Sequence, residues 1–496
     1  MQISFILNIL LVFVFVSTPC FSLNVLFNLP CHGGNFVTMA SLLGPICSRH
    51  NCTVIEVAQM CERKLKSYQK NIKFRSIKAH VLPNEYSFEG GFKFLLTFCP
   101  SVVDTFEKTH DAFDKIMKEW ATEFDVFITD QIFWATMVLA EKYNIPTIVS
   151  TPGLPSGLEH LQDKIPVGVG ESIIFSLFHQ KCWKWIEDKR NEYNLPPMKF
   201  QGQFSMTEFT DRFPLFLPTT PSLYGEPHPS AEFVFTGGFR DEEDLPKIDN
   251  DLKTWIDSDD ADIVYLSLGT FVTMDKKVFK DFYEKMHKQN RYRLIWSLGL
   301  GLQNIAKELG IFPQKDNKIL LSDYLPQYAL LCHPKVKVFV THIGLGSAIE
   351  LMKQKIPGVF VPQFFDQPMN TIIMENLSLG VSASSFDFEH VDNAIQKVFD
   401  NYDFYYKNLE KISDEFAKYE DPEMIDNFIQ KIAARKKTTV KLELEYQVSS
   451  PRLYMAWNAI QILAVALLIL FILTMYWCAR KCCFRKGRES KETKAD

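Results

Sequence analysis

One stretch of the chain constrains its fold more than any other, because it combines two buried strands with a glycine-containing turn. Residues 336–341 are mostly apolar, a loop with His342 and Gly344 follows, and a helix-like stretch begins near Ser347. A second short apolar run lies at 359–361. This order is typical of a parallel sheet, in which the helix N-terminus beside the loop is a ready site for a phosphate. The stretch therefore indicates a site for a phosphate with a polyol close by, as in a nucleotide sugar.

Strand-like and helix-like segments alternate through most of the chain, and this alternation predicts a parallel sheet with helices on both faces. An acidic stretch at 240–262, with little apolar pattern, interrupts the alternation and is predicted to be a linker. We therefore expect two doubly wound α/β domains. The first has predicted strands at 23–29, 53–58, 125–130 and 147–150 and a helix at 133–143; the second has predicted strands at 263–268, 293–296, 336–341 and 359–361 and a helix at 276–288.

Both ends of the chain predict membrane targeting. Residues 1–22 are apolar, carry no charged side chain and end in small residues, which favours a signal peptide; a buried first strand or an uncleaved anchor is the alternative. Residues 459–478 are apolar and flanked by Trp457 and Trp477, and as a helix they would span about 30 Å, the thickness of a hydrocarbon core. The basic residues that follow place the tail in the cytosol. We expect a single-pass type I membrane protein whose bulk lies in the lumen, with the endoplasmic reticulum as the expected compartment.

Composition excludes some classes of function and leaves others open. A net charge of −5 gives no case for binding nucleic acid. The eleven cysteines show no zinc-ligand spacing, and disulfides are permitted in the lumen but cannot be paired from the sequence. Asn51 and Asn376 lie in patterns that accept N-linked glycans. The sequence leaves open whether the chain forms a homo-oligomer.

The residues around His342 have the chemistry of a nucleotide-sugar site. If a helix begins near Ser347, its free N–H groups and its dipole favour the binding of a diphosphate. The side chains of His342 and Ser347 can donate further hydrogen bonds to it. Glu350 shares a helix face with Ser347 and can accept hydrogen bonds from ribose hydroxyls. Asp366 and Gln367 follow the next strand and offer polar groups to a sugar. Each residue alone also fits an ordinary strand–loop–helix, so the prediction depends on the whole set.

The segment from Tyr324 to Gln367 resembles the nucleotide-sugar signature of the UDP-glycosyltransferase superfamily, whose membrane-bound animal members are the UDP-glucuronosyltransferases. It contains, in the family's order, Tyr324-Leu325-Pro326-Gln327, Thr341-His342-Ile343-Gly344, Ser347, Glu350 and Asp366-Gln367. The resemblance implies a GT-B fold: two Rossmann-like, doubly wound domains that face a cleft, here with a C-terminal transmembrane helix. The ranges expected are a signal peptide (1–22), an N-terminal acceptor-binding domain (23–245), a C-terminal UDP-sugar-binding domain (246–436), a juxtamembrane segment (437–458), a transmembrane helix (459–478) and a basic cytosolic tail (479–496).

The resemblance also implies a role for each matching residue of the UDP-sugar site. Tyr324 would stack on uracil, Gln327 would bind the base or ribose, Thr270, His342, Gly344 and Ser347 would meet the diphosphate, Glu350 the ribose, and Asp366 and Gln367 the sugar.

Four positions depart from the family's pattern. Tyr324 stands in place of Trp, Gly346 in place of Asn, and Ser297 where many animal members carry Arg. Ile343 stands in place of Gly or another small residue, so the loop is expected to approach a phosphate less closely.

The N-terminal half is expected to supply the general base. His32 follows a strand in a glycine-containing loop, and Asp130 ends another strand; both match the family's catalytic pair. The imidazole would take the proton of an acceptor hydroxyl as that oxygen attacks the anomeric carbon, while the carboxylate fixes the tautomer. A loop histidine and a helix-capping Asp are the ordinary alternatives.

Together these features predict an inverting transferase that moves a sugar from a UDP-sugar to a hydroxyl of a small lipophilic acceptor. Glucuronic acid is the first expectation for the sugar, and glucose is the alternative. The alternative function is that of a non-catalytic membrane protein of the same fold that binds a nucleotide sugar or a lipid. No metal or other cofactor is expected. The two Asp-x-Asp patterns at 249–251 and 257–259 lie in the predicted linker, where solvated charge is the simpler interpretation.

Overall fold

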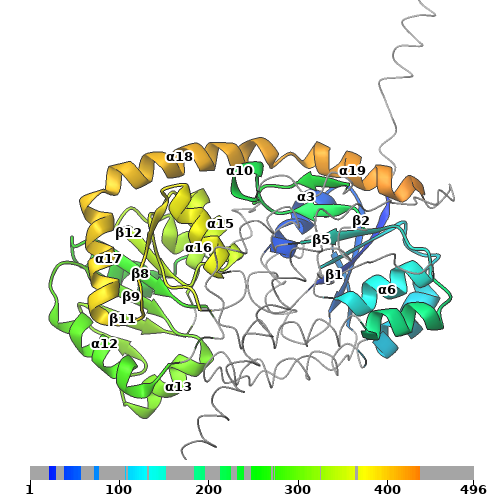
Figure 1. The fold of residues 1–496 in the computed structure, drawn as a ribbon. Coiled ribbons are helices and arrows are strands. Elements are labelled where there is room, and N and C mark those ends of the chain that lie inside the picture. The colour runs from blue at the N-terminus through cyan, green and yellow to red at the C-terminus, as the bar shows by residue number, and fades with distance from the viewer. Residues whose placement is uncertain are drawn as a thin grey trace, which may run out of the picture.

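In the part of the chain that the structure describes, two seven-stranded sheets form the framework, one built from residues before 240 and one from residues after it (Figure 1). The structure is a computed structural model. The structure describes residues 22–29, 38–56, 72–76, 107, 110–130, 133–151, 184–195, 213–224, 232–238, 247–269, 272, 274–323, 325–363 and 367–435.

The first sheet is entirely parallel, with the strand order β3-β2-β1-β4-β5-β6-β7. Its central strands are buried on both faces, which explains their nearly continuous apolar sequences. The strands are β1 (Asn24–Leu29), β2 (Asn51–Glu56), β3 (Ile72–Ser76), β4 (Val126–Asp130), β5 (Thr147–Ser150), β6 (Leu215–Leu217) and β7 (Phe233–Phe235); the helices bounded within this part are α3 (Leu43–Cys47), α6 (Trp134–Lys142) and α10 (Pro221–Tyr224).

The second sheet has the order β10-β11-β9-β8-β12-β13-β14 and is parallel except for the short edge strand β10. Its strands are β8 (Ile263–Ser267), β9 (Arg293–Ser297), β10 (Gln314–Lys315), β11 (Ile319–Ser322), β12 (Val336–Thr341), β13 (Gly358–Phe360) and β14 (Gly380–Ser382). Its helices are α11 (Asn250–Asp257), α12 (Lys276–Lys288), α13 (Leu300–Glu308), α14 (Gln327–Leu331), α15 (Leu345–Gln354), α16 (Gln367–Asn376), α17 (Phe388–Asp400) and α18 (Tyr402–Tyr419).

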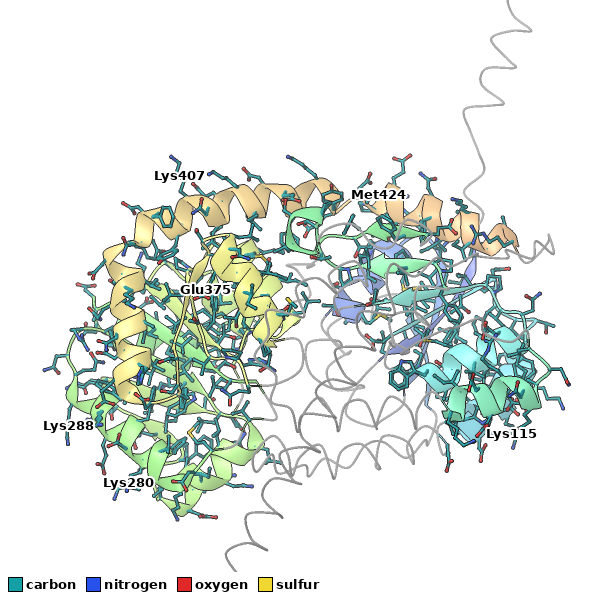
Figure 2. The ribbon with its side chains drawn as sticks, in the orientation of Figure 1. Lys115, Lys280, Lys288, Glu375, Lys407 and Met424 are labelled. Carbon is teal, nitrogen blue, oxygen red and sulfur yellow. A yellow bond between two sulfur atoms is a disulfide. The ribbon has the colours of Figure 1, made fainter. Side chains whose placement is uncertain are left out.

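Alternate residues of each strand in the second sheet face two separate cores. Ile263 and Tyr265 of β8 pack among α11, α14, α15, α16 and α18, whereas Val264 and Leu266 face α12, α13 and α17. The helices supply matching apolar stripes: in α12 the side chains of Phe279, Phe282 and Met286 are buried, while lysines such as Lys280 and Lys288 point to solvent (Figure 2). Both domains are therefore doubly wound, and the predicted α/β class is confirmed.

The acidic stretch at 240–262 was predicted to be a linker, and this is wrong for its C-terminal part. Residues 250–257 form α11, which begins at Asp249, whose carboxylate accepts a hydrogen bond from the Leu252 N–H at 2.7 Å. Leu252, Trp255 and Ile256 are buried against the second sheet. The helix is short and its exposed face is polar, so the three apolar residues are too few to stand out in the sequence.

The last described helix, α19 (Pro422–Ala434), packs on the first sheet although it follows α18 of the second domain (Figure 1). Ile425, Phe428 and Ile429 join the core of the first domain. The Asp426 carboxylate lies 2.7 Å from Nε2 of His50, and both side chains are buried. In Figure 2, Met424 marks α19 beside the first domain and Lys407 marks α18 beside the second. The domain boundaries stay a prediction, but the range 246–436 includes a helix that packs on the other sheet.

Several predicted segments lie outside the described residues. They are residues 1–21 of the predicted signal peptide and the juxtamembrane segment, transmembrane helix and tail at 437–496. Among the helices that the structure describes, none combines the length and the apolar character needed to cross a membrane.

Candidate nucleotide-sugar site

The carboxyl edge of the second sheet carries small hydroxyl side chains at aligned positions. Ser322, Ser297, Ser267 and Thr341 end β11, β9, β8 and β12 and pair in register. Because β9 and β12 flank β8 on opposite sides, the winding of the sheet reverses between β8 and β12. In open α/β sheets a ligand binds at this reversal, outside the carboxyl ends of the strands.

His342 lies at this reversal, where the loops after β8 and β12 meet. Its Nε2 atom is 2.8 Å from the place where a Cβ on Gly269 would lie and 3.0 Å from the same place on Gly344. Any larger side chain at either glycine would therefore displace the ring, and Gly269 also has a φ of 78°. Protein atoms enclose the imidazole closely. This burial lowers the pKa of His342 to about 4, and a hydrogen bond with the Ser267 backbone offsets the shift only in part. At neutral pH the ring is uncharged and has one N–H, which donates to the Ser267 backbone.

Ile343 adopts a left-handed backbone conformation, with a φ of 57°. Its side chain is fully buried in the core of the second domain. The sequence predicts that an Ile here would hold the loop away from a phosphate. How closely the loop approaches a phosphate stays a prediction. The structure shows the side chain packed among core residues, and the unusual feature is the backbone strain of a β-branched residue in this region.

The first turn of α15 follows directly, with Gly344 as its N-cap and no capping hydrogen bond from a side chain. One turn further, Glu350 is 7% exposed, and its Oε2 accepts a hydrogen bond from Gln327 Nε2 at 2.5 Å. The same nitrogen lies 3.5 Å from Ser347 Oγ, and the Tyr265 hydroxyl donates to Gln327 Oε1 at 3.1 Å. The structure thus brings together three residues that the sequence predicts for the UDP site: Gln327, Ser347 and Glu350.

Gln367 is the first residue of α16 and is buried, and its Oε1 accepts a hydrogen bond from the Gln363 N–H at 2.8 Å. Three residues later, Asn370 is also buried and donates from Nδ2 to the carbonyl of Ile343 at 2.8 Å. The sequence interpretation missed Asn370, although its spacing from Gln367 places both on one helix face. The predicted residues His32, Thr270, Tyr324 and Asp366 lie outside the described residues.

In the first domain, Asp130 ends β4 and is fully buried at the carboxyl edge of its sheet. Two neighbouring strands also carry buried polar residues near their carboxyl ends: Asn28 is the next-to-last residue of β1, and Ser150 is the last residue of β5. Neither the Asn28 amide nor the Ser150 hydroxyl makes a hydrogen bond in the structure described here. The sequence interpretation also missed Asn28 as a candidate site residue, although it is a single amide inside an otherwise apolar strand. A buried amide without a hydrogen-bond partner lowers the stability of the fold. The polar groups at this edge therefore do not stabilise the core.

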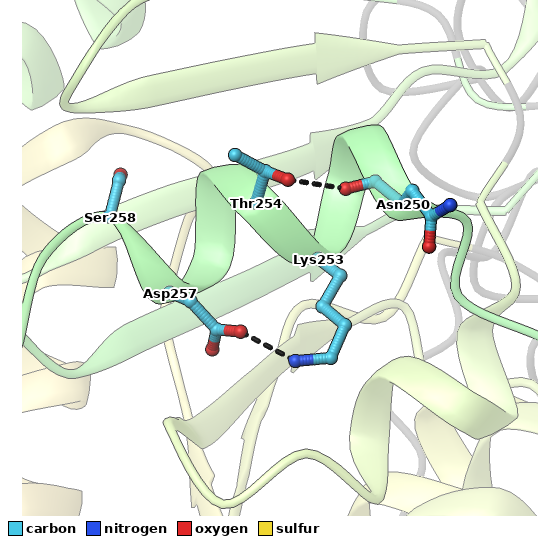
Figure 3. Close-up of a pocket in the computed structure, with 5 residues that line it drawn as sticks. All are labelled: Asn250, Lys253, Thr254, Asp257 and Ser258. Atoms are coloured by element: carbon cyan, nitrogen blue, oxygen red, sulfur yellow. Dashed lines mark hydrogen bonds and ion pairs between the residues drawn. The ribbon is translucent and has the colours of Figure 1, made fainter.

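The Asp-x-Asp patterns lie away from this site. Asp249 caps α11 and Asp257 pairs with Lys253 at 2.6 Å. Figure 3 shows a shallow pocket on the exposed face of this helix, lined by Asn250, Lys253, Thr254, Asp257 and Ser258, none of them a predicted site residue. Within the described part of the chain, no three His, Cys, Asp or Glu side chains are arranged to hold a metal ion.

Comparison with known proteins agrees with this geometry. Residues 216–419 match the family described as "UDP-glucoronosyl and UDP-glucosyl transferase". The chain is 27% identical to a putative UDP-glucuronosyltransferase, ugt-47, of Caenorhabditis elegans over 36% of its own length, but it spans only about a third (32%) of that relative. It is 25% identical to human UDP-glucuronosyltransferase 1A3, with 76% of this chain and 73% of that protein covered.

The fold is also similar to that of a solved UDP-glucosyltransferase from Polygonum tinctorium. The TM-score is 0.61 at 14% sequence identity, with 85% of this chain and all of that chain covered. The predicted GT-B-like arrangement of two parallel-sheet domains is thereby confirmed. With the family match and the loop geometry taken together, residues 216–419 match a UDP-glycosyltransferase domain, and the chain resembles the animal UDP-glucuronosyltransferases.

Proposed function

We propose that the protein transfers a glycosyl group, with inversion, from a UDP-sugar to a hydroxyl of a small lipophilic acceptor. The observation that carries the proposal is the sheet reversal between β8 and β12, where His342 and the uncapped start of α15 lie side by side. Free N–H groups at a helix start bind anions, and the helix dipole favours the negative charge of a diphosphate.

The UDP moiety is expected to extend from this helix start toward α14. Glu350 accepts from the ribose hydroxyls, with its carboxylate oriented by the Gln327 amide. The neutral His342 ring lies beside the diphosphate and adds no positive charge, and its hydrogen bond with the Ser267 backbone helps to orient it. Stabilisation of the UDP leaving group then depends on backbone N–H groups and the dipole of α15, which are fixed before the sugar bond breaks.

The acceptor is activated from the other domain. His32 takes the proton from the acceptor hydroxyl while that oxygen forms the new bond to the anomeric carbon, and UDP leaves from the opposite face. Asp130, buried at the end of β4, holds the imidazole in the tautomer that can accept this proton and stabilises the imidazolium that forms. General base assistance of this kind contributes about 10²–10⁴-fold in rate.

The identity of the sugar has two candidates. The resemblance to the glucuronosyltransferases supports glucuronic acid. Ser297 supports glucose. It ends β9, in register with Ser267, and has a neutral hydroxyl at the position where many animal members of the family carry Arg. An arginine there would pair with the carboxylate of glucuronic acid, and a serine cannot. A direct competition between the two donors decides between them.

The setting of the reaction is proposed to be a membrane surface in the lumen of the endoplasmic reticulum. The disulfide between Cys47 and Cys52 supports an oxidising compartment. A membrane-anchored enzyme would meet lipophilic acceptors where they partition, and the aromatic acceptor named for the plant relative, indoxyl, has this character.

The test is a transfer assay on microsomes that contain the full-length protein, with radiolabelled UDP-glucuronic acid and UDP-glucose and a panel of phenols and steroids. We expect transfer from one donor, and a loss of about 10²–10⁴-fold in the His32→Ala variant. Absence of transfer from either donor would favour a non-catalytic binding protein of the same fold. Transfer that is unaffected by His32→Ala would reject the assignment of the base.

A further inference from the structure

The turn between β12 and α15 contains a conflict between residue type and conformation. Ile343 is β-branched and fully buried, yet its φ is 57°. Residues of this kind rarely adopt the left-handed region, and such strain persists only where the surroundings hold it in place. The neighbours of Ile343 must therefore provide that restraint.

Hydrogen bonds hold the backbone of Ile343 on both sides. Its N–H donates to Thr341 Oγ1 at 3.1 Å, and its carbonyl accepts from Asn370 Nδ2 at 2.8 Å. Thr341 is fully buried and Asn370 is 1% exposed, so both bonds are shielded from water. A shielded hydrogen bond is stronger electrostatically than the same bond in solvent.

The restrained turn lies between the two groups that are proposed to meet the diphosphate. His342 precedes Ile343 and is enclosed by Gly269 and Gly344, while Gly344 follows and caps α15. A rotation of the Ile343 backbone would therefore move the imidazole and the first N–H groups of α15 together. The donor site depends on this single turn keeping its conformation.

We propose that Asn370 is a positioning residue for the donor site, which it serves by holding the left-handed turn at Ile343. It acts through the backbone, with no contact to the donor required. Asn370 lies three residues after Gln367 on α16, so one helix links the residue predicted for the sugar to the turn beside the diphosphate. The proposal rests on the proposed function, because it takes the ligand of the turn to be the diphosphate of a UDP-sugar.

The test is calorimetric titration of the full-length protein with UDP, together with KM and kcat for the donor. The Asn370→Leu variant keeps a similar side-chain size and removes the N–H donor. We expect it to raise the Kd of UDP by about tenfold, with a parallel rise in KM. Adding Ile343→Gly should restore most of the UDP affinity, because glycine adopts the left-handed conformation without strain. A purely structural role would not show this rescue, since Ile343→Gly also removes a buried side chain and lowers stability.

A matched control lies on α18. Asn408 also donates from Nδ2 to the carbonyl of a residue with positive φ, Ser378, at 3.4 Å, and Ser378 has a φ of 55°. Asn408→Leu makes the same chemical change outside the β12–α15 turn, so the Kd of UDP should stay at the wild-type value. If Asn370→Leu does not fold, Thr341→Val removes the other restraint on Ile343 and should weaken UDP binding in the same way.

The outcomes separate the two proposals. If wild type binds UDP and Asn370→Leu binds it equally well, the positioning role is overturned and the proposed function stands. A weakened Asn370→Leu variant that Ile343→Gly does not rescue also overturns the role of the turn. If the wild-type protein itself does not bind UDP, the proposed function fails, and the positioning role fails with it.

Discussion

Replacing His342 by Gln is expected to remove much of the acid sensitivity of the second domain. Burial holds the pKa of His342 at about 4, whereas a histidine in an unfolded chain titrates near 6.5. Between these two values the unfolded state binds more protons than the folded state, so the free energy of unfolding falls as the pH falls from about 6.5 to about 4. Below about 4 both states are protonated at this site, and the loss is complete.

The size of the effect follows from the difference between the two pKa values. That difference corresponds to at most about 3 kcal/mol in full, and to about 2 kcal/mol on going from pH 7.5 to pH 5.0. Glutamine keeps a hydrogen-bonding side chain but does not titrate. The His342→Gln variant should therefore lose about 2 kcal/mol less than wild type over this pH interval, whatever its stability at pH 7.5.

The assay is urea unfolding at both pH values, followed by the fluorescence of buried tryptophans of the second domain such as Trp255 and Trp296. Comparing the change with pH within each protein cancels any packing loss that the substitution causes. An equal loss of unfolding free energy in the two proteins would refute the conclusion that the folded protein keeps the His342 ring neutral.

Three further substitutions test other parts of the structure. Gly238→Ala would place a Cβ 2.4 Å from Cγ2 of Ile349 on α15, so it should lower the free energy of unfolding by about 1–3 kcal/mol in urea denaturation; an unchanged midpoint would contradict the close approach. Glu350→Ala should raise the Kd of UDP about tenfold or more by calorimetry, because charged hydrogen bonds to ribose are lost, and unchanged affinity would exclude that contact. Asp426→Ala removes the carboxylate that lies 2.7 Å from Nε2 of the buried His50, so it should lower the free energy of unfolding by about 1–3 kcal/mol and speed hydrogen exchange in α19. Unaltered exchange there would contradict the docking of this helix.

Most of the regular structure could be predicted because strand and helix periods are clear in the sequence. The strands at 147–150 and 336–341 and the helix at 276–288 have the predicted bounds. Each has a continuous apolar run or a stripe at helical spacing, which burial on one or two faces requires.

Two features could not be predicted, because they depend on contacts that are distant in sequence. The helix α11 is recognisable only when Trp255 is seen against the second sheet, since the helix is short and its other face is polar. The packing of α19 on the first domain depends on pairs such as Arg49 and Asp426, which are 377 residues apart. No local pattern encodes the partner of an amphipathic helix.

The candidate site likewise combines residues that local sequence patterns predict with features that depend on contacts distant in sequence. The sequence predicts the helix start beside His342 and the polar residues Gln327, Ser347 and Glu350, and the structure brings these three together. It does not predict that His342 is neutral, because that depends on its enclosure by protein atoms, with Gly269 against the ring. Nor does it predict the restraint on Ile343, which comes from Asn370 on a later helix.

The most direct test of the donor site is hydrogen exchange at the start of α15, measured by mass spectrometry on the full-length protein with and without UDP. The N–H groups of Gly346 and Ser347 lie in the first turn, where a helix supplies no internal acceptor and Gly344 supplies no side-chain cap. We predict that UDP slows exchange of these amides. UDP that binds while their exchange stays unchanged would contradict a diphosphate site at this helix.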